Sequence, residues 1–424
     1  MTEHYDVLVV GAGPAGLAAA DAAAAQGARV ALLDAQPHAG GQIWRHDVRQ
    51  APPAVATRSI RAGLRQPIAW MPDSSVIAAE GDAVLVQTPQ AAQWLHYRRL
   101  VLATGARELL LPFPGWTLPG VVGAGGSQAL AKQGWPLAGR HVVVAGSGPL
   151  LLAAAATLQQ HGAIVAAICE QAEASALRGF AAGLWRWPGK LLQAAQLRLR
   201  LAGVPYRSGT AVRRALSSAD GGRLRAVEIA SPRGTEQLAC DMLAVGYGLV
   251  PNTELARLLG CAMQPHGAHA AVQVDDRQRS SLADVYAAGE VCGIGGVDCA
   301  RIEGAIAGLT AAGAEVPARL LRQRSHARAF AAALRRAFAL PPSVHALASP
   351  DTVVCRCEDV TLGMLDGHAD FRSAKLATRC GMGACQGRIC GAALAELGRF
   401  PHAGSRPPLF PARLSTLAHT DPVS

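Results

Sequence analysis

The sequence is poor in charged residues, aromatic residues and long apolar runs, and each scarcity excludes a class of protein. Charged residues make up 17% and aromatic residues 4% of the 424 residues, while half of the chain is apolar. This composition predicts a folded globular protein of two or three domains. No uninterrupted apolar run approaches the roughly 20 residues of a membrane span, so no transmembrane segment is expected. The few aromatics are not interleaved with basic residues, which argues against nucleic-acid binding.

The amino terminus lacks the charged region and cleavage site of a secretory signal, so we expect a cytoplasmic protein. Lysine is also scarce, and the net charge of +10 is carried almost entirely by arginine. The charge is uneven, because residues 317–350 contain six arginines and no acid. This pattern indicates either a solvated helix face or a docking surface for an acidic partner.

Cysteine is absent from residues 1–168, and no Cys-x-x-Cys motif occurs anywhere. Near the other end, a Cys-x-Cys pair and a Cys-x4-Cys pair lie in glycine-bearing turns and can supply four thiolates to a [2Fe–2S] cluster. A zinc site with the same thiolates is the alternative. Cys380 precedes Cys385 by the same spacing that separates Cys385 from Cys390, so spacing alone leaves five candidates for four positions. The five earlier cysteines are expected to be small buried hydrophobic residues.

A glycine-rich loop follows the first apolar run. Residues 5–10 predict a buried parallel strand, the loop runs from Gly11 to Gly16, and a helix follows to about Gln26. A second strand ends at Asp34, at the distance that the dinucleotide fingerprint requires. Gly11 permits the tight turn, Gly13 lets the backbone approach a pyrophosphate, and Gly16 lets helix and strand pack closely. The remaining candidate cofactor residues are Pro14, Ala15, Gly41, Gln42, Ala103, Thr104, Gly105, Gly289 and Glu290.

The chain then repeats this pattern. A strand over residues 141–145 leads into Gly146-Ser147-Gly148, a helix, a further strand and Glu170. The repeat predicts a second Rossmann-like domain. Its third glycine is replaced by Leu151, whose side chain is expected to push the helix away from the strand. Whether NAD or ATP binds at Gly146–Gly148 therefore stays open.

Three motifs occur in the order typical of flavoproteins with two dinucleotide-binding domains: Gly11–Gly16 with Asp34, Ala103-Thr104-Gly105, and Ala288-Gly289-Glu290. Residues 1–315 therefore resemble the relatives of thioredoxin reductase and glutathione reductase. The resemblance implies an α/β fold, with the FAD diphosphate at the first loop and Glu290 at the ribityl chain. That family more often has Asp at this position. The redox-active disulfide of the reductases has no counterpart here, so disulfide reduction is excluded.

The carboxy-terminal third resembles a narrower group. Cys355-x-Cys357 and the run from Thr378 to Gly391 are similar to the [2Fe–2S] domain of bacterioferritin-associated ferredoxin. With the flavoprotein part, the whole chain resembles the FAD subunits of hydrogen cyanide synthase, opine oxidases and dye-linked proline or hydroxyproline dehydrogenases. The resemblance implies a small helical [2Fe–2S] domain whose ligands, with Cys380 left out, are Cys355, Cys357, Cys385 and Cys390.

The expected organisation places a discontinuous FAD-binding domain at residues 1–118 and 240–316. The second Rossmann-like domain is expected at 119–239. A basic helical linker at 317–350, a [2Fe–2S] domain at 351–400 and a Pro-rich tail at 401–424 complete the chain.

No catalytic residue can be named, since the chain shows no Ser/His/Asp set, His/Glu metal motif or paired carboxylates. The resemblance implies that a partner flavoprotein subunit of the D-amino-acid-oxidase type holds the amino-acid site, beside a further small subunit. We therefore expect an electron-transfer subunit of an amino-acid or imino-acid dehydrogenase, delivering electrons to a quinone or dye-like acceptor. Such a complex could lie at the inner face of the membrane through its partners. The alternatives are an NADH-dependent reductase and a nucleotide-binding scaffold subunit.

Overall fold

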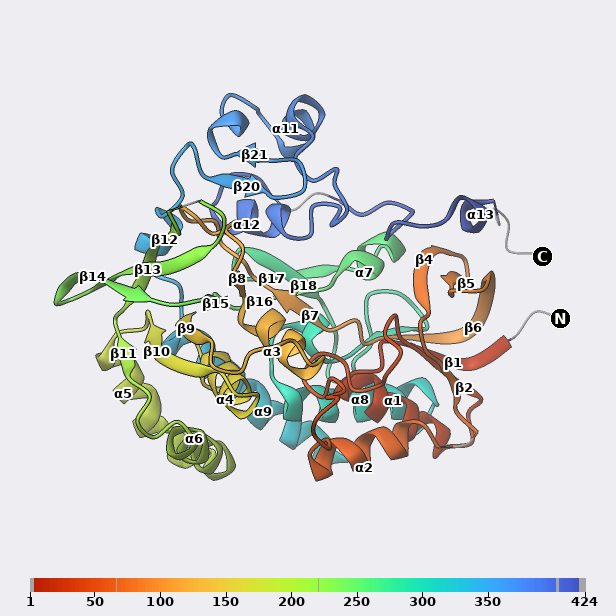
Figure 1. Ribbon diagram of the computed structural model, residues 1–424. Coiled ribbons are helices and arrows are strands. Elements are labelled where there is room, and N and C mark those ends of the chain that lie inside the picture. Colours follow the sequence, from red (N-terminus) through yellow and green to blue (C-terminus); the bar gives the residue numbers. More distant parts are fainter. Residues whose placement is uncertain (1–3, 66, 220, 402–403, 419–424) are drawn as a thin grey trace. The chain divides into compact units, whose positions relative to one another are not determined.

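The computed structural model describes residues 4–65, 67–219, 221–401 and 404–418 (Figure 1). The chain divides into two compact units, each assembled from segments that are distant in the sequence. The first unit comprises Met1–Arg107, Val250–Ala331 and Gly404–Ser424, and the second comprises Glu108–Leu249 and Ala332–Ala403. Among the described residues, no helix combines the length and the apolar character needed to cross a bilayer.

A seven-stranded sheet forms the centre of the first unit, in the order β3-β2-β1-β6-β5-β4 with β19 paired to β6. Its strands are β1 (His4–Val10), β2 (Val30–Leu33), β3 (Ala69–Met71), β4 (Ser75–Glu80), β5 (Ala83–Gln87), β6 (Ala92–Leu102) and β19 (Val285–Ala287). β1, β2, β3, β6 and β19 are parallel to one another, whereas β4 and β5 are paired antiparallel. All four residues of β2 are buried, as expected for a parallel strand that helices cover on its faces.

Helices and two short strands complete the first unit. They are α1 (Pro14–Ala24), α2 (Ala54–Gly63), α7 (Glu254–Leu259), β17 (Met263–His266), β18 (His269–Val272), η2 (Gly289–Cys292), α8 (Val297–Ala311) and α13 (Leu414–Leu417). α1 and α8 pack closely because α8 carries glycine where it meets α1. A Cβ at Gly304 would lie 2.0 Å from the carbonyl oxygen of Ala15, and one at Gly308 would lie 2.2 Å from that of Ala19. Long α9 (Ala318–Ala337) follows and continues into the second unit's sequence.

The second unit contains a five-stranded sheet in the order β11-β10-β9-β15-β8 and a three-stranded antiparallel sheet, β12-β13-β14. The elements from residue 106 to residue 251 are β7 (Ala106–Glu108), β8 (Val121–Gly123), α3 (Ala124–Lys132), β9 (His141–Gly146), α4 (Leu150–Gln160), β10 (Ile164–Glu170), α5 (Ala174–Gly183), η1 (Leu184–Arg186), α6 (Pro188–Arg200), β11 (Tyr206–Ser208), β12 (Ala211–Ser217), β13 (Leu224–Ser231), β14 (Gly234–Ala239), β15 (Met242–Gly246) and β16 (Leu249–Pro251). The short strands β7 and β16 pair with each other. Two sheets, each with parallel strands around a strand–glycine loop–helix unit, confirm the predicted α/β fold.

The carboxy-terminal segment of the second unit has its own small core. Its elements are α10 (Pro342–His345), β20 (Val353–Cys355), β21 (Val360–Thr361), η3 (Gly363–Leu365), α11 (Phe371–Thr378) and α12 (Cys390–Glu396). Three of the clustered cysteines lie in that core beside Val354, Phe371 and Leu394. The described part of the tail belongs instead to the first unit, where the Leu409 N–H donates to the carbonyl oxygen of Ile77 at 2.8 Å.

Candidate functional site

The first glycine loop has the tight geometry that the sequence predicts. A Cβ at Gly16 would lie 1.7 Å from the carbonyl oxygen of Gly11, so only glycine lets α1 start this close to β1. Gly11 has φ +105°, and a Cβ there would lie 2.3 Å from the carbonyl oxygen of Ala103. Pro14 occupies the first turn of α1, where a missing N–H costs nothing. Gly13 and the start of α1 therefore present backbone N–H groups and the positive end of the helix dipole, as a pyrophosphate requires.

Asp34, at the end of β2, accepts hydrogen bonds from the Ala12 N–H at 2.6 Å and the Gln36 N–H at 2.8 Å. Burial raises the pKa of Asp34, although both N–H groups oppose the shift. The carboxylate thus fixes the glycine loop to the second strand, as in a dinucleotide-binding turn. Gly41 belongs to the same turn, because its Cβ would lie 2.9 Å from Cα of Gly13. Gln42 is exposed and accepts from Arg45.

The Ala103-Thr104-Gly105 turn follows β6 beside the glycine loop. The Thr104 hydroxyl donates to the carbonyl oxygen of Asn252 at 2.7 Å, and the Asn252 side-chain amide donates back to the Thr104 carbonyl at 2.9 Å. The Asn252 N–H also donates to the carbonyl oxygen of Gly105 at 3.0 Å. The Thr104 hydroxyl therefore joins two crossing segments of the unit, a partnership that local sequence does not indicate.

Gly289 and Glu290 begin η2, directly after β19. A Cβ at Gly289 would lie 2.8 Å from Cβ of Ala15, which places this turn against the start of α1. One carboxylate oxygen of Glu290, Oε1, accepts from the Gly296 N–H at 2.7 Å. The other, Oε2, is buried and has no hydrogen-bond partner among the described residues. Burial raises the pKa of Glu290 to about 7, although the Gly296 and Gly295 N–H groups oppose the shift.

These features fit FAD. A buried carboxylate oxygen without a donor beside a glycine loop suits a ribityl hydroxyl, and the close-packed loop suits a diphosphate. Gly13, Asp34 and Glu290 are the residues of this chain that we expect to contact the dinucleotide.

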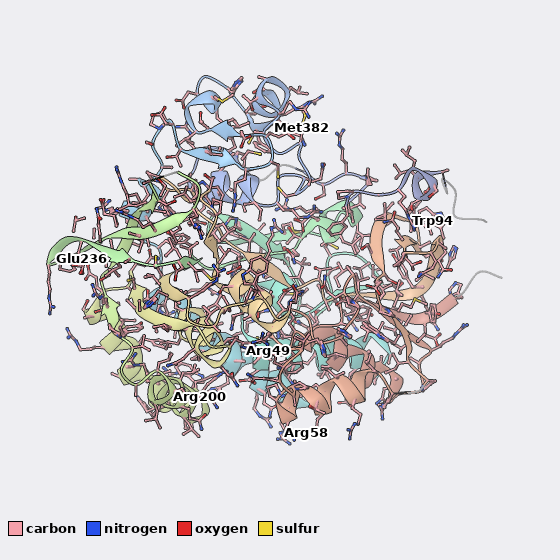
Figure 2. The ribbon with its side chains drawn as sticks, viewed as in Figure 1. Arg49, Arg58, Trp94, Arg200, Glu236 and Met382 are labelled. Atoms are coloured by element: carbon pink, nitrogen blue, oxygen red, sulfur yellow. The ribbon has the colours of Figure 1, made fainter. Side chains whose placement is uncertain are left out.

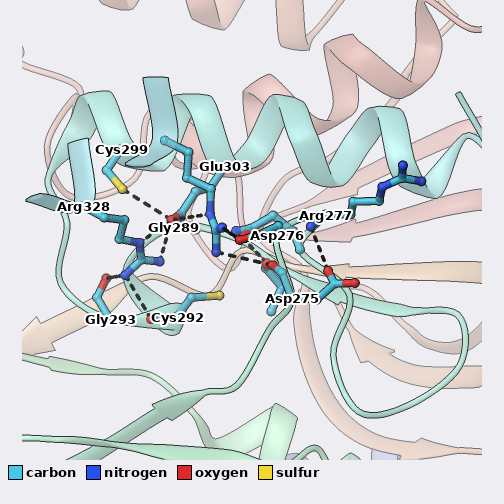
Figure 3. Close-up of polar contacts among 12 residues, drawn as sticks. Asp275, Asp276, Arg277, Gly289, Cys292, Gly293, Cys299, Glu303 and Arg328 are labelled. Atoms are coloured by element: carbon cyan, nitrogen blue, oxygen red, sulfur yellow. Dashed lines mark hydrogen bonds and ion pairs between the residues drawn. The ribbon is translucent and has the colours of Figure 1, made fainter. Parts of the chain in front are cut away.

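The turn at Gly289 contacts a buried ion pair that the sequence did not indicate (Figure 3). Glu303 of α8 is 1% exposed and pairs with Arg328 of α9, whose Nε donates to Oε1 at 2.6 Å. Its Oε2 accepts the Gly289 N–H at 3.1 Å, and the Cys299 thiol donates to Oε1 at 3.4 Å. Arg324 lies 3.6 Å from the same carboxylate. Two arginines of the predicted basic linker are therefore bound internally rather than free for a partner.

Arg328 also orders the loop that follows η2. Its Nη1 donates to the carbonyl oxygen of Cys292 at 3.2 Å and to that of Gly293 at 3.4 Å. Cys292 and Cys299 are both buried, as predicted, and burial raises the pKa of both thiols. The predicted FAD-side turn is thus held by α8 and α9 together.

The second glycine loop keeps part of this design. Glu170 is fully buried and accepts from the Gly148 N–H at 2.8 Å and the Ala172 N–H at 2.9 Å, as Asp34 does in the first unit. Leu151 is also fully buried, and α4 starts four residues after Gly146, whereas α1 starts three after its first glycine. The two helices thus begin at nearly the same place in their loops, and displacement of the helix from its strand by Leu151 stays a prediction.

The residue after α9 also contacts this second loop. The Ser147 hydroxyl donates to the carbonyl oxygen of Phe338 at 3.1 Å. The Phe338 ring packs edge-on against Phe180 of α5, with centroids 5.5 Å apart. A hydroxyl that a phosphate could use is therefore bound to the chain itself.

The structure gathers thiols at the predicted iron–sulfur domain. The Sγ atoms of Cys355, Cys380 and Cys390 lie within 4.8 Å of one another, and all three side chains are buried. Cys385 is half-buried and Cys357 is exposed. A Cβ at Gly383 would lie 2.2 Å from Cβ of Cys357, so glycine is required where this loop passes the Cys-x-Cys turn. Cys380, which the resemblance leaves out, is thus the most buried of the five.

The thiols share protons unequally. A hydrogen bond from the Cys390 thiol, with N–H groups of Ile389 and Gly387, lowers the pKa of Cys385 to about 4. The same Cys390 thiol lowers the pKa of Cys380, and its own pKa is strongly raised. Thiols packed this closely favour loss of protons to a thiophilic metal, because cysteine binds iron or zinc as the thiolate. This donor set fits a [2Fe–2S] cluster, which takes four cysteine thiolates.

Trp116 fixes the Cys-x-Cys turn from the middle of the second unit. Its indole Nε1 donates to the carbonyl oxygen of Val353 at 2.5 Å. The guanidinium of Arg356, between the two cysteines, lies 5.2 Å from the centre of the indole ring. No local pattern signals this contact, because 237 residues separate Trp116 from Val353.

Comparison with known proteins agrees with this architecture. Residues 5–314 match the family described as pyridine nucleotide-disulphide oxidoreductase. The chain belongs to this family. It is also 35% identical to an opine oxidase subunit of Rhizobium meliloti (strain 1021), over 98% of each chain. Hydrogen cyanide synthase subunit HcnB of Pseudomonas aeruginosa is 32% identical over 90% of each chain.

Among solved structures, L-proline dehydrogenase from P. horikoshii has a similar fold, with a TM-score of 0.68 and 20% identity. The alignment covers 98% of this chain and 80% of that one. These similarities confirm the family predicted from the sequence, and the protein is an FAD-dependent oxidoreductase.

Proposed function

We propose that this chain is the electron-transfer subunit of a multi-subunit amino-acid or imino-acid dehydrogenase or oxidase. A partner flavoprotein subunit of the D-amino-acid-oxidase type would hold the amino-acid site. Electrons would leave this chain to a quinone or dye-like acceptor. The opine oxidase subunit and hydrogen cyanide synthase subunit HcnB, both similar along most of their length, are named as subunits, the first of them of an oxidase.

The observation that carries the proposal is a group of three buried thiols, with Cys385 hydrogen-bonded to one of them, in a chain that also has an FAD-type glycine loop. Bound FAD supplies two-electron acceptance, and a [2Fe–2S] cluster supplies one-electron transfer. Gly13, Asp34 and Glu290 would bind the dinucleotide, and Cys355, Cys357, Cys385 and Cys390 would hold the iron.

The test is replacement of single thiols in the purified complex. We expect Cys355→Ser and Cys385→Ser to lose iron and the electron paramagnetic resonance signal of the reduced cluster, while substrate still bleaches the flavin. Cys240→Ser is the matched control, since this buried thiol of the same unit lies outside the cluster. Full turnover with artificial acceptors after loss of the cluster would refute the proposal, as would zinc in place of iron.

Cys380→Ser decides the ligand set. Under the proposed set this variant keeps its iron and its signal, although Cys380 is fully buried beside Cys355 and Cys390. If Cys380→Ser loses its iron while Cys357→Ser or Cys385→Ser retains it, then Cys380 is a ligand in place of the cysteine whose variant retains iron.

An NADH-dependent reductase is the second candidate, because Glu170 holds the second glycine loop as Asp34 holds the first. Anaerobic mixing of the purified chain with NADH separates the two. The electron-transfer proposal expects the flavin absorbance to stay unchanged, because Leu151 and the Ser147–Phe338 contact alter the second loop. Rapid bleaching would support the reductase.

A further inference from the structure

An exposed helical segment, residues 174–200, follows β10 in the second unit (Figure 1). It comprises α5, η1 and α6, and in this segment only Leu184 is buried. A helix on the surface of a globular protein normally turns an apolar stripe toward the core. Here neither α5 nor α6 contributes a buried residue, so core packing does not explain the apolar side chains that they carry.

Those apolar side chains face solvent. Trp185 is 75% exposed, Leu192 is 60% exposed and Leu199 is 77% exposed. Leu192 and Leu199 are seven residues apart on α6, which places them on the same face two turns from each other. Single exposed apolar residues need no explanation, but an aligned group on an exposed helix indicates a binding surface.

The charge of the segment is of one sign. Arg178, Arg186, Lys190, Arg198 and Arg200 lie within it, and no acid occurs between Glu173 and Asp220. Arg186 and Arg198 lie over the rings of Trp187 and Tyr206. Arg200 is the last residue of α6 and is exposed (Figure 2). Charge complementarity therefore requires an anionic occupant.

Of the anionic occupants, a lipid surface fits best. In a protein–protein interface the apolar side chains gather at the centre, and the polar side chains gather at the rim. On α6, in contrast, leucine and arginine alternate from Leu197 to Arg200. Helices that lie in a membrane interface combine Leu and Trp with Lys and Arg in this way, since acyl chains and headgroup phosphates occur side by side.

We propose that residues 174–200 bind the surface of an anionic phospholipid bilayer. Trp185, Leu192 and Leu199 insert among the acyl chains, and the arginines pair with headgroup phosphates. The segment lies in the headgroup region and does not span the bilayer. The inference is independent of which acceptor the enzyme uses.

The test is co-sedimentation of the full-length holoprotein with vesicles. We expect binding to vesicles of equal parts phosphatidylcholine and phosphatidylglycerol, and about tenfold weaker binding to pure phosphatidylcholine. The double variant Leu192→Ser/Leu199→Ser and the double variant Arg178→Glu/Arg200→Glu should each reduce binding by at least about tenfold. Because all four side chains are exposed, flavin content and circular dichroism should not change.

The matched controls are substitutions of the same types at exposed residues outside the segment. Leu376 of α11 is 66% exposed, and Arg319 and Arg322 of α9 are exposed. Leu376→Ser and Arg319→Glu/Arg322→Glu should bind the anionic vesicles like the unchanged protein. The tryptophan emission should shift to the blue on binding, and Trp185→Phe should remove most of that shift.

Three results would overturn the proposal. One is the absence of binding to anionic vesicles. Another is equal loss of binding in the Arg319→Glu/Arg322→Glu control, which would indicate non-specific attraction of a basic protein. A third is self-association that Leu192→Ser/Leu199→Ser abolishes in light scattering, which would make the stripe a contact between copies of the chain.

Discussion

Replacing Glu303 by glutamine tests the buried ion pair that joins α8 to α9. The carboxylate is 1% exposed, and the Arg328 and Arg324 side chains are 26% and 15% exposed. Glutamine keeps the size and can still accept the Gly289 N–H, but it removes the charge that the two arginines face. Each arginine then keeps a buried positive charge with fewer partners.

The size of the effect follows from this burial. Removing one partner of a fully buried ion pair costs about 3–5 kcal/mol. Glutamine retains hydrogen bonds and the arginines have some access to water, so we expect about 2–3 kcal/mol for Glu303→Gln. With a urea dependence of about 2–3 kcal/mol per molar, the unfolding midpoint should fall by about 1 M.

The assay is the urea midpoint followed by circular dichroism, which reports on both units, and by release of bound flavin, which reports on the unit that contains Glu303. Glu236→Gln is the control, since Glu236 and Arg207 form a pair with side chains 48% and 33% exposed. An exposed pair contributes at most about 1 kcal/mol, and added salt weakens it. The Glu236→Gln midpoint should therefore move little, and the Glu303→Gln shift should persist in high salt.

A double variant separates charge from packing. If the loss in Glu303→Gln comes from the unpaired guanidinium, then Arg328→Met in the same chain should restore much of the midpoint, because it removes the charge that Glu303→Gln leaves without a carboxylate. A double variant that is as unstable as the sum of the single variants would refute this reasoning. So would a Glu303→Gln midpoint no lower than that of Glu236→Gln.

Three further outcomes are expected. Gly16→Ala should reduce bound flavin per protein at least tenfold, because its Cβ would lie 1.7 Å from the Gly11 carbonyl oxygen, and normal flavin absorbance would contradict this. Burial raises the pKa of Glu290 to about 7, above its unfolded value, so folding favours the protonated form and stability falls as pH rises from about 4.5 to 7. In the flavin-free protein, Glu290→Gln should remove most of this loss of stability between pH 5 and pH 7.5, as measured by urea unfolding. An unchanged pH profile would contradict the prediction. Trp116→Phe removes the hydrogen bond to Val353 and weakens the contact with Arg356. On heating, the cluster absorbance should therefore be lost at a temperature roughly 4–8 °C lower than in the unchanged protein. An unchanged temperature would contradict this prediction.

The fold could be predicted because its signals are local. A strand, a glycine loop and a helix occur within about 25 residues, and each conformation is dictated by neighbouring residues, as the Gly16–Gly11 approach demonstrates. The second loop was recognisable for the same reason. The surroundings of Leu151 were not predictable. Its side chain is fully buried beside Gly246 of the parallel strand β15, where a Cβ would be in ordinary contact with Cδ2 of Leu151 at 3.4 Å.

The parts of the site that sequence reasoning missed all depend on tertiary contacts. Glu303 and Arg328 lie 25 residues apart on two helices, and composition described Arg328 only as part of a basic run. In the folded chain its guanidinium pairs with a buried carboxylate, so its charge is not available to a binding partner. The basic surface of α9 is therefore smaller than the count of arginines indicates.

The thiol cluster separates what residue spacing could predict from what depends on tertiary contacts. Spacing identified five cysteines but could not rank them, because Cys380 to Cys385 and Cys385 to Cys390 have the same separation. In the folded chain the five thiols differ in burial and in proximity, and Cys380 lies close to both Cys355 and Cys390. A metal selects ligands by a further criterion, the geometry of its own bonds, which neither spacing nor burial encodes. For this reason the choice between Cys380 and Cys385 belongs to iron analysis of single variants.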